Sequence, residues 1–355
     1  MNLKYTLFLL LCSAVAVHAA VPIMPLSEIK PGMRGEWHTV VSGTKIERFE
    51  LEVIGVVPNF VAPKQSVIFC KALSADQILL GGVEGMSGSP VYIDGKLVGA
   101  YAYGFDWPKE QALVGISPIE EMLKVLELPD VVGAPSPGYK NRPMPGANKL
   151  DVPYAIKEQL GVDPKTTVSM KPAPVPLMAG GFSPRVLAYF EPHFSQMGIQ
   201  VRAAPVGASD DASLANPDAV QPGSALAAVV MGGDFEMAAV GTLTWRDGDR
   251  VLAFGHPFLQ AGPVRMPMAT AEVVTIVQNY EASFKLAKLG PVIGCFTQDR
   301  LTATAGQIGK IAPVTHVRFN IQYEQGTTRT YCGDLFENQK LTPVISAASF
   351  MESLS

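Results

Sequence analysis

Apolar and polar residues alternate most clearly in two stretches of the chain. In the first, Phe49, Leu51 and Val53 are separated by charged residues within 46–57, and the second covers 317–323. A period of two places one face of an extended strand in a core and the other face in solvent. Both stretches therefore predict half-buried β-strands.

Shorter apolar runs predict further strands, including those at 67–69 and 78–80. The pairs Asp94-Gly95 and Asp247-Gly248 each lie between two such runs. Asp-Gly pairs favour tight hairpin turns because both central residues tolerate positive φ. With 33 glycines and 29 prolines in 355 residues, the chain is predicted to be mainly β with many turns.

A few short helices are predicted where a capping residue precedes an apolar period. Ser117 with Pro118 and Glu120 supplies a cap, a first-turn proline and a capping-box acid ahead of 119–126. Ser183-Pro184 repeats this arrangement ahead of 185–196. Weaker helical patterns cover 152–160 and 342–355.

The first residues have the pattern of a secretory signal peptide. Lys4 precedes an apolar core at Thr6–Val17, and small residues favour cleavage after Ala19 or Ala20. The core is short for a membrane span, and no later segment is long enough. We therefore expect an exported chain, periplasmic or extracellular, with no stable membrane span after cleavage.

Breaker-rich segments indicate how the chain divides. The expected parts are a signal peptide (1–19), a β domain (20–128), a Pro/Gly-rich linker region (129–182), a second β domain (183–330) and a C-terminal helical tail (331–355).

Charge and cysteine content narrow the possible chemistry. A net charge of −4 gives no electrostatic basis for binding nucleic acid. Besides Cys70, the mature chain has Cys295 and Cys332, which are the candidates for one disulfide. The sequence has no Cys-x-x-Cys motif and its histidines are scattered, so we expect neither a metal site nor a cofactor.

One loop combines glycines with a serine just ahead of the Asp94-Gly95 hairpin. Its sequence is Gly85-Met86-Ser87-Gly88-Ser89-Pro90. Glycines allow successive backbone N–H groups to point into one cavity, where they can hold the oxyanion formed when a serine attacks a carbonyl. Ser87 is the candidate nucleophile and Ser89 its competitor. The alternative interpretation is a plain turn between strands.

A histidine ends the second predicted hairpin. His256 lies between Gly255 and Pro257 in Leu252-Ala253-Phe254-Gly255-His256-Pro257. This context indicates a side chain that the backbone positions rather than one that fills a core. Ser87 and His256 together suggest a nucleophile and its base.

These two motifs resemble those of the SpoIVB sporulation-peptidase family, serine peptidases with a trypsin-like active site. The resemblance extends from about Pro25 to about Pro313. It implies Ser87 as nucleophile, His256 as base, and the N–H groups of Gly85 and Ser87 as oxyanion donors. It also implies two trypsin-like β-barrel halves. The serine precedes the histidine here, the reverse of the sporulation peptidase, which indicates a permuted order.

The acidic member of the triad has two candidates. Trypsin-like histidine and aspartate share one barrel, so in a permuted chain the acid should follow His256, which favours Asp299. Asp76 is the alternative because it lies close before the serine. Asp299 could equally form an ion pair with Arg300 or cap an element, whereas Asp247 and Asp249 fit the hairpin turn.

Three functional hypotheses follow. The first is a secreted serine endopeptidase of the SpoIVB type acting on protein or peptide substrates. The second is a catalytically inactive, peptidase-like binding or scaffold protein of the cell envelope. The third, an acyl hydrolase, is disfavoured because an esterase serine joins a strand to a helix, whereas this loop leads into a hairpin.

Overall fold

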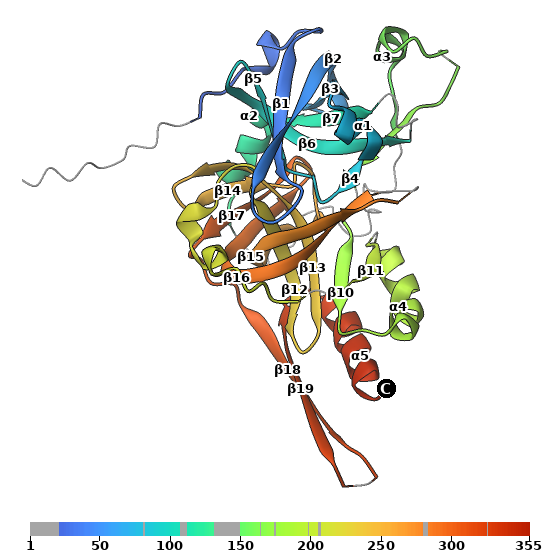
Figure 1. Ribbon diagram of the computed structural model, residues 1–355, viewed down its shortest axis with the longest axis vertical. Helices are drawn as coiled ribbons and strands as arrows, with labels where there is room; N and C mark the ends of the chain where they lie inside the picture. The colour runs from blue at the N-terminus through green and yellow to red at the C-terminus, as the bar shows by residue number, and fades with distance from the viewer. Residues whose placement is uncertain are drawn as a thin grey trace, which may run out of the picture.

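The computed structural model describes residues 21–355 except 81, 107–111, 131–149, 164, 174, 198, 205–206, 280–282 and 325. The expected signal peptide lies outside the described residues. The described chain forms two β-sheets, one above the other in Figure 1. The prediction of a mainly β fold with two barrel-like halves is confirmed.

The first sheet is built mostly from the N-terminal half. Its order is β5-β1-β2-β3-β7-β6-β9-β8, and an additional β5–β6 pairing closes six of these strands into a ring. We call this ring the first barrel. The strands are β1 (Arg34–Val40), β2 (Ile46–Ala62), β3 (Gln65–Ala72), β5 (Pro90–Ile93), β6 (Lys96–Asp106), β7 (Leu113–Pro118), β8 (Leu150–Asp151) and β9 (Ser169–Pro172).

The second sheet has the order β11-β10-β13-β14-β17-β16-β15-β12-β19-β18, and a β13–β12 pairing closes six of its strands into a second ring. We call this ring the second barrel. The strands are β10 (Leu177–Gly180), β11 (Val201–Ala203), β12 (Ala225–Gly233), β13 (Glu236–Asp247), β14 (Arg250–Ala253), β15 (Gly262–Val277), β16 (Ser283–Arg300), β17 (Ala303–Ile308), β18 (Val314–Gln322) and β19 (Thr328–Phe336). The β18–β19 hairpin extends away from the body (Figure 1).

One short strand crosses from the first half of the chain to the second sheet. β4 (Val83–Glu84) runs parallel to β16, with Val83 opposite Ser283 and Glu84 opposite Phe284. The loop that carries Ser87 follows β4 directly. The second sheet therefore holds the entrance to this loop, and β5 of the first barrel holds its exit.

Part of the expected linker region takes part in the sheets. β8 and β9 extend the first sheet beyond β6, and β10 pairs with β13 of the second. Residues 131–149 lie outside the described residues. The expected helical tail begins with the end of β19 and continues into α5 (Leu341–Ser353).

The helices are short. They are α1 (Ala75–Leu80), α2 (Ile119–Leu123), α3 (Tyr154–Gln159), α4 (Pro184–Gln196) and α5, with 3₁₀ turns at Leu26–Glu28, Lys124–Glu127, Ala212–Ala215 and Pro217–Ala219. The Ser183 hydroxyl caps α4 by accepting from the Val186 N–H at 3.4 Å. The strand predicted at 78–80 is wrong, because these residues belong to α1.

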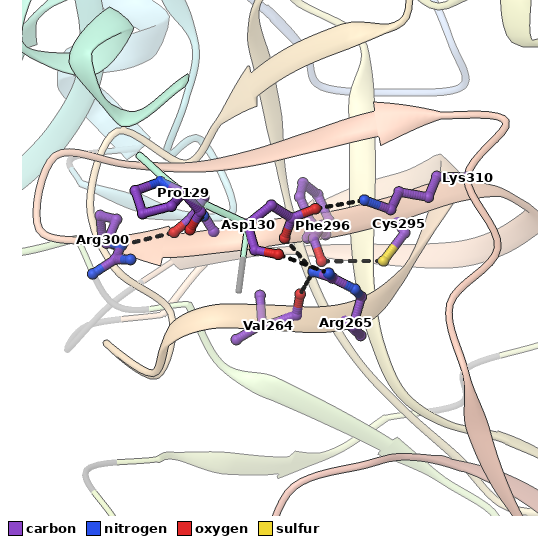
Figure 2. A network of polar contacts seen from close by, with 9 residues as sticks. Pro129, Asp130, Val264, Arg265, Cys295, Phe296, Arg300 and Lys310 are labelled. Carbon is purple, nitrogen blue, oxygen red and sulfur yellow. Dashed lines mark hydrogen bonds and ion pairs between the residues drawn. The ribbon is translucent and has the colours of Figure 1, made fainter. Parts of the chain in front are cut away.

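A polar network ties the residues that follow α2 and its 3₁₀ turn to the second sheet (Figure 2). Asp130 forms ion pairs with Arg265 on β15 and with Lys310, the latter at 2.6 Å. Partial burial opposes ionisation of Asp130, but the two cations hold its pKa below the usual range. The Gln298 amide also donates to the Pro129 carbonyl at 3.0 Å. The chain after α2 is thus fastened to β15 and β16.

The cysteines do not form the disulfide considered from the sequence. Cys295 is buried on β16, where its thiol donates to the Phe296 carbonyl at 3.2 Å (Figure 2), and Cys332 is exposed on β19. Cys70 is free as well. The two candidate partners lie on strands that are not neighbours in the sheet.

Candidate active site

Ser87 lies in a tight loop between β4 and β5, and this loop packs against the second barrel. Gly85 and Gly88 have φ values of +91° and +93°. A Cβ on Gly88 would lie 2.0 Å from the Thr242 carbonyl oxygen and 2.4 Å from the Phe254 nitrogen, so only glycine fits. The Thr242 N–H also donates to the Ser87 carbonyl at 2.8 Å. The loop therefore presses its backbone directly onto β13.

His256 follows β14 on a segment that turns sharply toward the first barrel. Phe254 and Gly255 both have positive φ, +66° and +70°. A Cβ on Gly255 would lie 3.0 Å from the Ala100 methyl and 3.1 Å from the Ala102 methyl, both on β6. Glycine thus permits the close approach that brings His256 to the first barrel.

Ser87 and His256 meet between the two barrels. The Ser87 Oγ lies 2.9 Å from the His256 Nε2, although the two residues are far apart in the sequence. Both residues are buried, with exposed fractions of 0% and 2%. The pair has the separation of a nucleophile hydrogen-bonded to its base.

The surroundings of His256 determine which ring nitrogen carries the proton. Its Nδ1 lies 2.8 Å from the Pro257 carbonyl oxygen. A carbonyl only accepts, so Nδ1 carries the hydrogen and the free Nε2 accepts the Ser87 hydroxyl. Burial lowers the pKa of His256 to about 4, although the bond to Pro257 opposes this. At neutral pH the imidazole is therefore uncharged and in the tautomer that a general base requires.

Asp299 lies beside the histidine segment but contacts a different part of it. Its buried carboxylate on β16 accepts the N–H groups of Phe258, Leu259 and Ala261 at 2.8, 2.7 and 3.1 Å. Burial raises the pKa of Asp299, and these bonds oppose the rise. Within the described residues no bond links it to His256, whose Nδ1 is taken by Pro257. Asp76 belongs to α1, and its side chain lies outside the description.

One expected oxyanion donor, the Ser87 N–H, differs from the N–H groups beside it in the loop. The N–H groups of Met86, Gly88 and Ser89 donate to carbonyls of Val83, Tyr101 and Met86, at 3.2, 2.8 and 2.9 Å. Among the described residues, the Ser87 N–H has no such acceptor. The competing serine, Ser89, donates its hydroxyl to the Met86 carbonyl at 2.5 Å, which commits it to the structure of the loop.

The resemblance noted in the sequence can be compared with known families. The SpoIVB peptidase S55 family model matches residues 11–122. This match confirms the resemblance to SpoIVB-type peptidases and supports a serine peptidase at the level of the family. The matched residues include Ser87, whereas His256 and Asp299 lie beyond them. No curated protein and no solved structure matches the chain.

The SpoIVB-like serine loop rests on a buried lysine that the sequence analysis missed. The Lys285 amine on β16 donates to the Thr39 hydroxyl at 2.7 Å and contacts the Thr242 hydroxyl at 3.4 Å. Burial lowers the pKa of Lys285 to about 7. Its sequence context, Ser-Phe-Lys-Leu-Ala-Lys, alternates like an ordinary amphipathic strand and gives no signal of a buried cation.

Ser117 was expected to cap α2, and this expectation is wrong. The residue preceding α2 is Pro118, without a side-chain cap. Ser117 lies within β7 instead, and its hydroxyl donates to the Gly255 carbonyl at 2.5 Å. A residue of the first barrel therefore helps to hold the histidine segment, a role that a local capping pattern could not reveal.

No group of three or more His, Cys, Asp or Glu side chains is arranged to hold a metal ion in the part of the chain that the structure describes. None of the helices found there is long and apolar enough to cross a membrane.

Proposed function

We propose that this chain is a serine endopeptidase of the SpoIVB type that cleaves peptide bonds through an acyl-enzyme. The observation that carries the proposal is the 2.9 Å contact between the Ser87 Oγ and the His256 Nε2, with Nδ1 held by the Pro257 carbonyl. The family match over the serine half supports the same conclusion independently.

In the proposed mechanism, the His256 Nε2 takes the Ser87 proton as the serine oxygen attacks the peptide carbonyl. The Gly85 and Ser87 N–H groups stabilise the tetrahedral oxyanion, and loss of one such donor typically costs ~10²–10³ in rate. The imidazolium then gives its proton to the leaving amine. Water, activated by His256, hydrolyses the acyl-enzyme and restores Ser87.

The His256 Nδ1 contacts the Pro257 carbonyl, whereas in a Ser–His–Asp triad it would contact a carboxylate. A neutral carbonyl fixes the tautomer but stabilises the imidazolium less than a carboxylate would. The proposed role of Asp299 is to hold residues 258–261, and through them the Pro257 carbonyl that orients the imidazole. Asp299 is then a positioning residue rather than a catalytic one.

A specific observation favours a second candidate function, a binding or scaffold protein. Ser87 and His256 are 0% and 2% exposed, so a peptide carbonyl reaches Ser87 only after surrounding residues move. A protein that never makes this movement would keep the peptidase architecture without turnover.

Labelling with a fluorophosphonate separates the two candidates. The purified mature chain should react, with the label mapped to Ser87 by mass spectrometry, and both Ser87→Ala and His256→Ala should abolish labelling. Ser349→Ala is the matched control, because Ser349 is an equally buried serine, in α5, whose hydroxyl bonds the Ile345 carbonyl at 2.9 Å. A folded wild-type chain that stays unlabelled and cleaves no peptide library would favour the scaffold.

We also propose that the chain is exported, on the basis of its N-terminal residues. Mass spectrometry of the protein recovered from the periplasm or the medium should place the mature N-terminus at residue 20 or 21. A full-length chain retained in the cytoplasm would contradict this proposal.

A further inference from the structure

The mechanism above gives no role to Lys285, a buried lysine beside the serine loop. Lys285 is 1% exposed, and its amine reaches Thr39 on β1 and Thr242 on β13. It therefore joins a hydroxyl of the first barrel to one of the second. Among the described residues it forms no ion pair, so its place in the interior depends on these hydroxyl groups.

Thr242 connects this amine to the serine loop. The Thr242 hydroxyl lies 3.2 Å from the Gly85 carbonyl oxygen, to which it must donate, since a carbonyl only accepts. The Thr242 oxygen can then accept from Lys285. This gives one direction of donation, from the Lys285 amine to the Thr242 hydroxyl to the Gly85 carbonyl. The Thr242 N–H adds the 2.8 Å bond to the Ser87 carbonyl.

The methylene groups of Lys285 hold the same glycine by packing. A Cβ on Gly85 would lie 3.2 Å from the Lys285 Cβ and 3.3 Å from its Cγ and Cδ. The stem of the lysine thus runs along the α-carbon of Gly85, where φ is +91°. Packing and hydrogen bonding together determine the direction of the Gly85 carbonyl, and with it the peptide plane between Gly85 and Met86.

We propose that Lys285 is a positioning residue of the serine loop: through Thr242 it holds the Gly85 carbonyl so that the N–H groups of Gly85 and Ser87 point to the tetrahedral oxyanion. This proposal rests on the proposed peptidase function for its catalytic consequence. Its structural part, the control of the loop by Lys285, can be measured without activity.

Two substitutions interrupt the donation at different points. Lys285→Met keeps an unbranched apolar stem and removes the amine, and Thr242→Val keeps the shape while removing the hydroxyl. Lys288→Met is the matched control, because Lys288 is half-buried on the same strand and pairs with Glu272 in the ladder. None of the three substitutions replaces a member of the ion pair of Glu84 with Arg202, which lies beside the loop at 3.2 Å.

The kinetic test compares kcat with KM for a cleaved peptide. Both Lys285→Met and Thr242→Val should lower kcat about 10- to 100-fold and leave KM within about twofold, because the oxyanion forms after substrate binds. Fluorophosphonate labelling should slow in parallel, and Lys288→Met should match the wild type. Unchanged kcat in a folded Lys285→Met protein would overturn the proposal.

The structural test follows the backbone amide resonances of Gly85, Met86 and Ser87 by NMR. These should shift in Lys285→Met and Thr242→Val but not in Lys288→Met. In the wild type they should titrate with a midpoint near 7, the lowered pKa of Lys285, and the titration should vanish in Lys285→Met. Glu84, whose pKa burial raises, and His256, whose pKa burial lowers to about 4, remain in Lys285→Met, so a titration that vanishes in this variant belongs to Lys285.

The two tests fail in distinguishable ways. Amide shifts without any wild-type labelling would refute the peptidase and retain the role of Lys285 in the loop. If the wild-type protein is active but the amide resonances do not shift in either variant, the role of Lys285 is refuted and the peptidase is retained. Should Lys285→Met fail to fold, Thr242→Val alone decides, because it leaves the lysine in place.

Discussion

The serine loop and the histidine segment are held in opposite ways by the two barrels. The serine loop leads into the first barrel, yet part of its support comes from Thr242 and Lys285 of the second. The histidine segment leaves the second barrel, yet Ser117 of the first barrel bonds the Gly255 carbonyl. Each half of the site is therefore complete only when the barrels are docked.

The two supports also differ in chemistry. Hydroxyl groups and one buried amine hold the serine loop, whereas the Asp299 carboxylate gathers three N–H groups behind the histidine. A carboxylate bonded to several N–H groups is a strong local clamp. The hydrogen bonds from the Lys285 amine through the Thr242 hydroxyl are weaker, and their strength depends on whether this amine is protonated. We therefore expect the serine loop to be the more adjustable half.

The largest effect is expected from Gly88→Ala. The new Cβ would collide with backbone atoms of Thr242 and Phe254, and φ at this position is +93°. Unfolding in urea should show a loss of roughly 3 kcal/mol or more, with labelling of Ser87 abolished. Gly95→Ala is the control, because its φ is +72° but no atom lies within 4 Å of the added Cβ, so it should lose only about 1 kcal/mol. Equal losses would show that backbone strain alone matters.

Asp299→Asn comes next and tests the clamp behind the histidine. An amide keeps the shape but turns an N–H group toward N–H donors, so we expect roughly 1–3 kcal/mol lower stability and at least a tenfold lower kcat/KM. The pKa of His256, followed by NMR, should stay near 4, since no bond joins the two side chains. A fall in that pKa would instead indicate direct contact between the Asp299 carboxylate and the imidazole.

An effect of comparable size is expected from pH. His256 has a folded-state pKa near 4 against an ordinary value of 6.5, so between these values the unfolded chain binds more protons. Its contribution to stability is present above pH 6.5 and is lost as pH falls toward 4, by roughly 3 kcal/mol. Urea unfolding at pH 4 and 7 should show this difference in the wild type beyond that in His256→Gln. An equal pH dependence in both proteins would contradict the assignment.

The smallest effect should come from Ser117→Ala. The variant leaves the Gly255 carbonyl without its 2.5 Å bond and should cost about 1 kcal/mol, with a few-fold slower labelling. Ser195→Ala on the exposed face of α4 should change neither stability nor labelling. A Ser117 variant indistinguishable from this control would show that the first barrel does not steer the histidine segment.

Much of the secondary structure could be predicted because its signals are local. Alternation at 46–57 became β2, the Asp94-Gly95 turn joins β5 to β6, and Ser183-Pro184 begins α4. The same local reasoning was wrong for 78–80, which are helical, and for Ser117, whose hydroxyl found a partner far away in the sequence. A capping pattern describes only what one residue offers to its neighbours, and tertiary contacts can claim it first.

By itself, the sequence determined the mainly β character and the two motifs around Ser87 and His256, because glycine, proline and periodicity act over a few residues. Only the tertiary structure decided which groups meet there: the Ser87–His256 bond, the Pro257 carbonyl on Nδ1, Asp299 behind the loop and Lys285 beneath it. These contacts join residues that are distant in the chain. They form when two closed barrels dock, and no local pattern encodes that geometry.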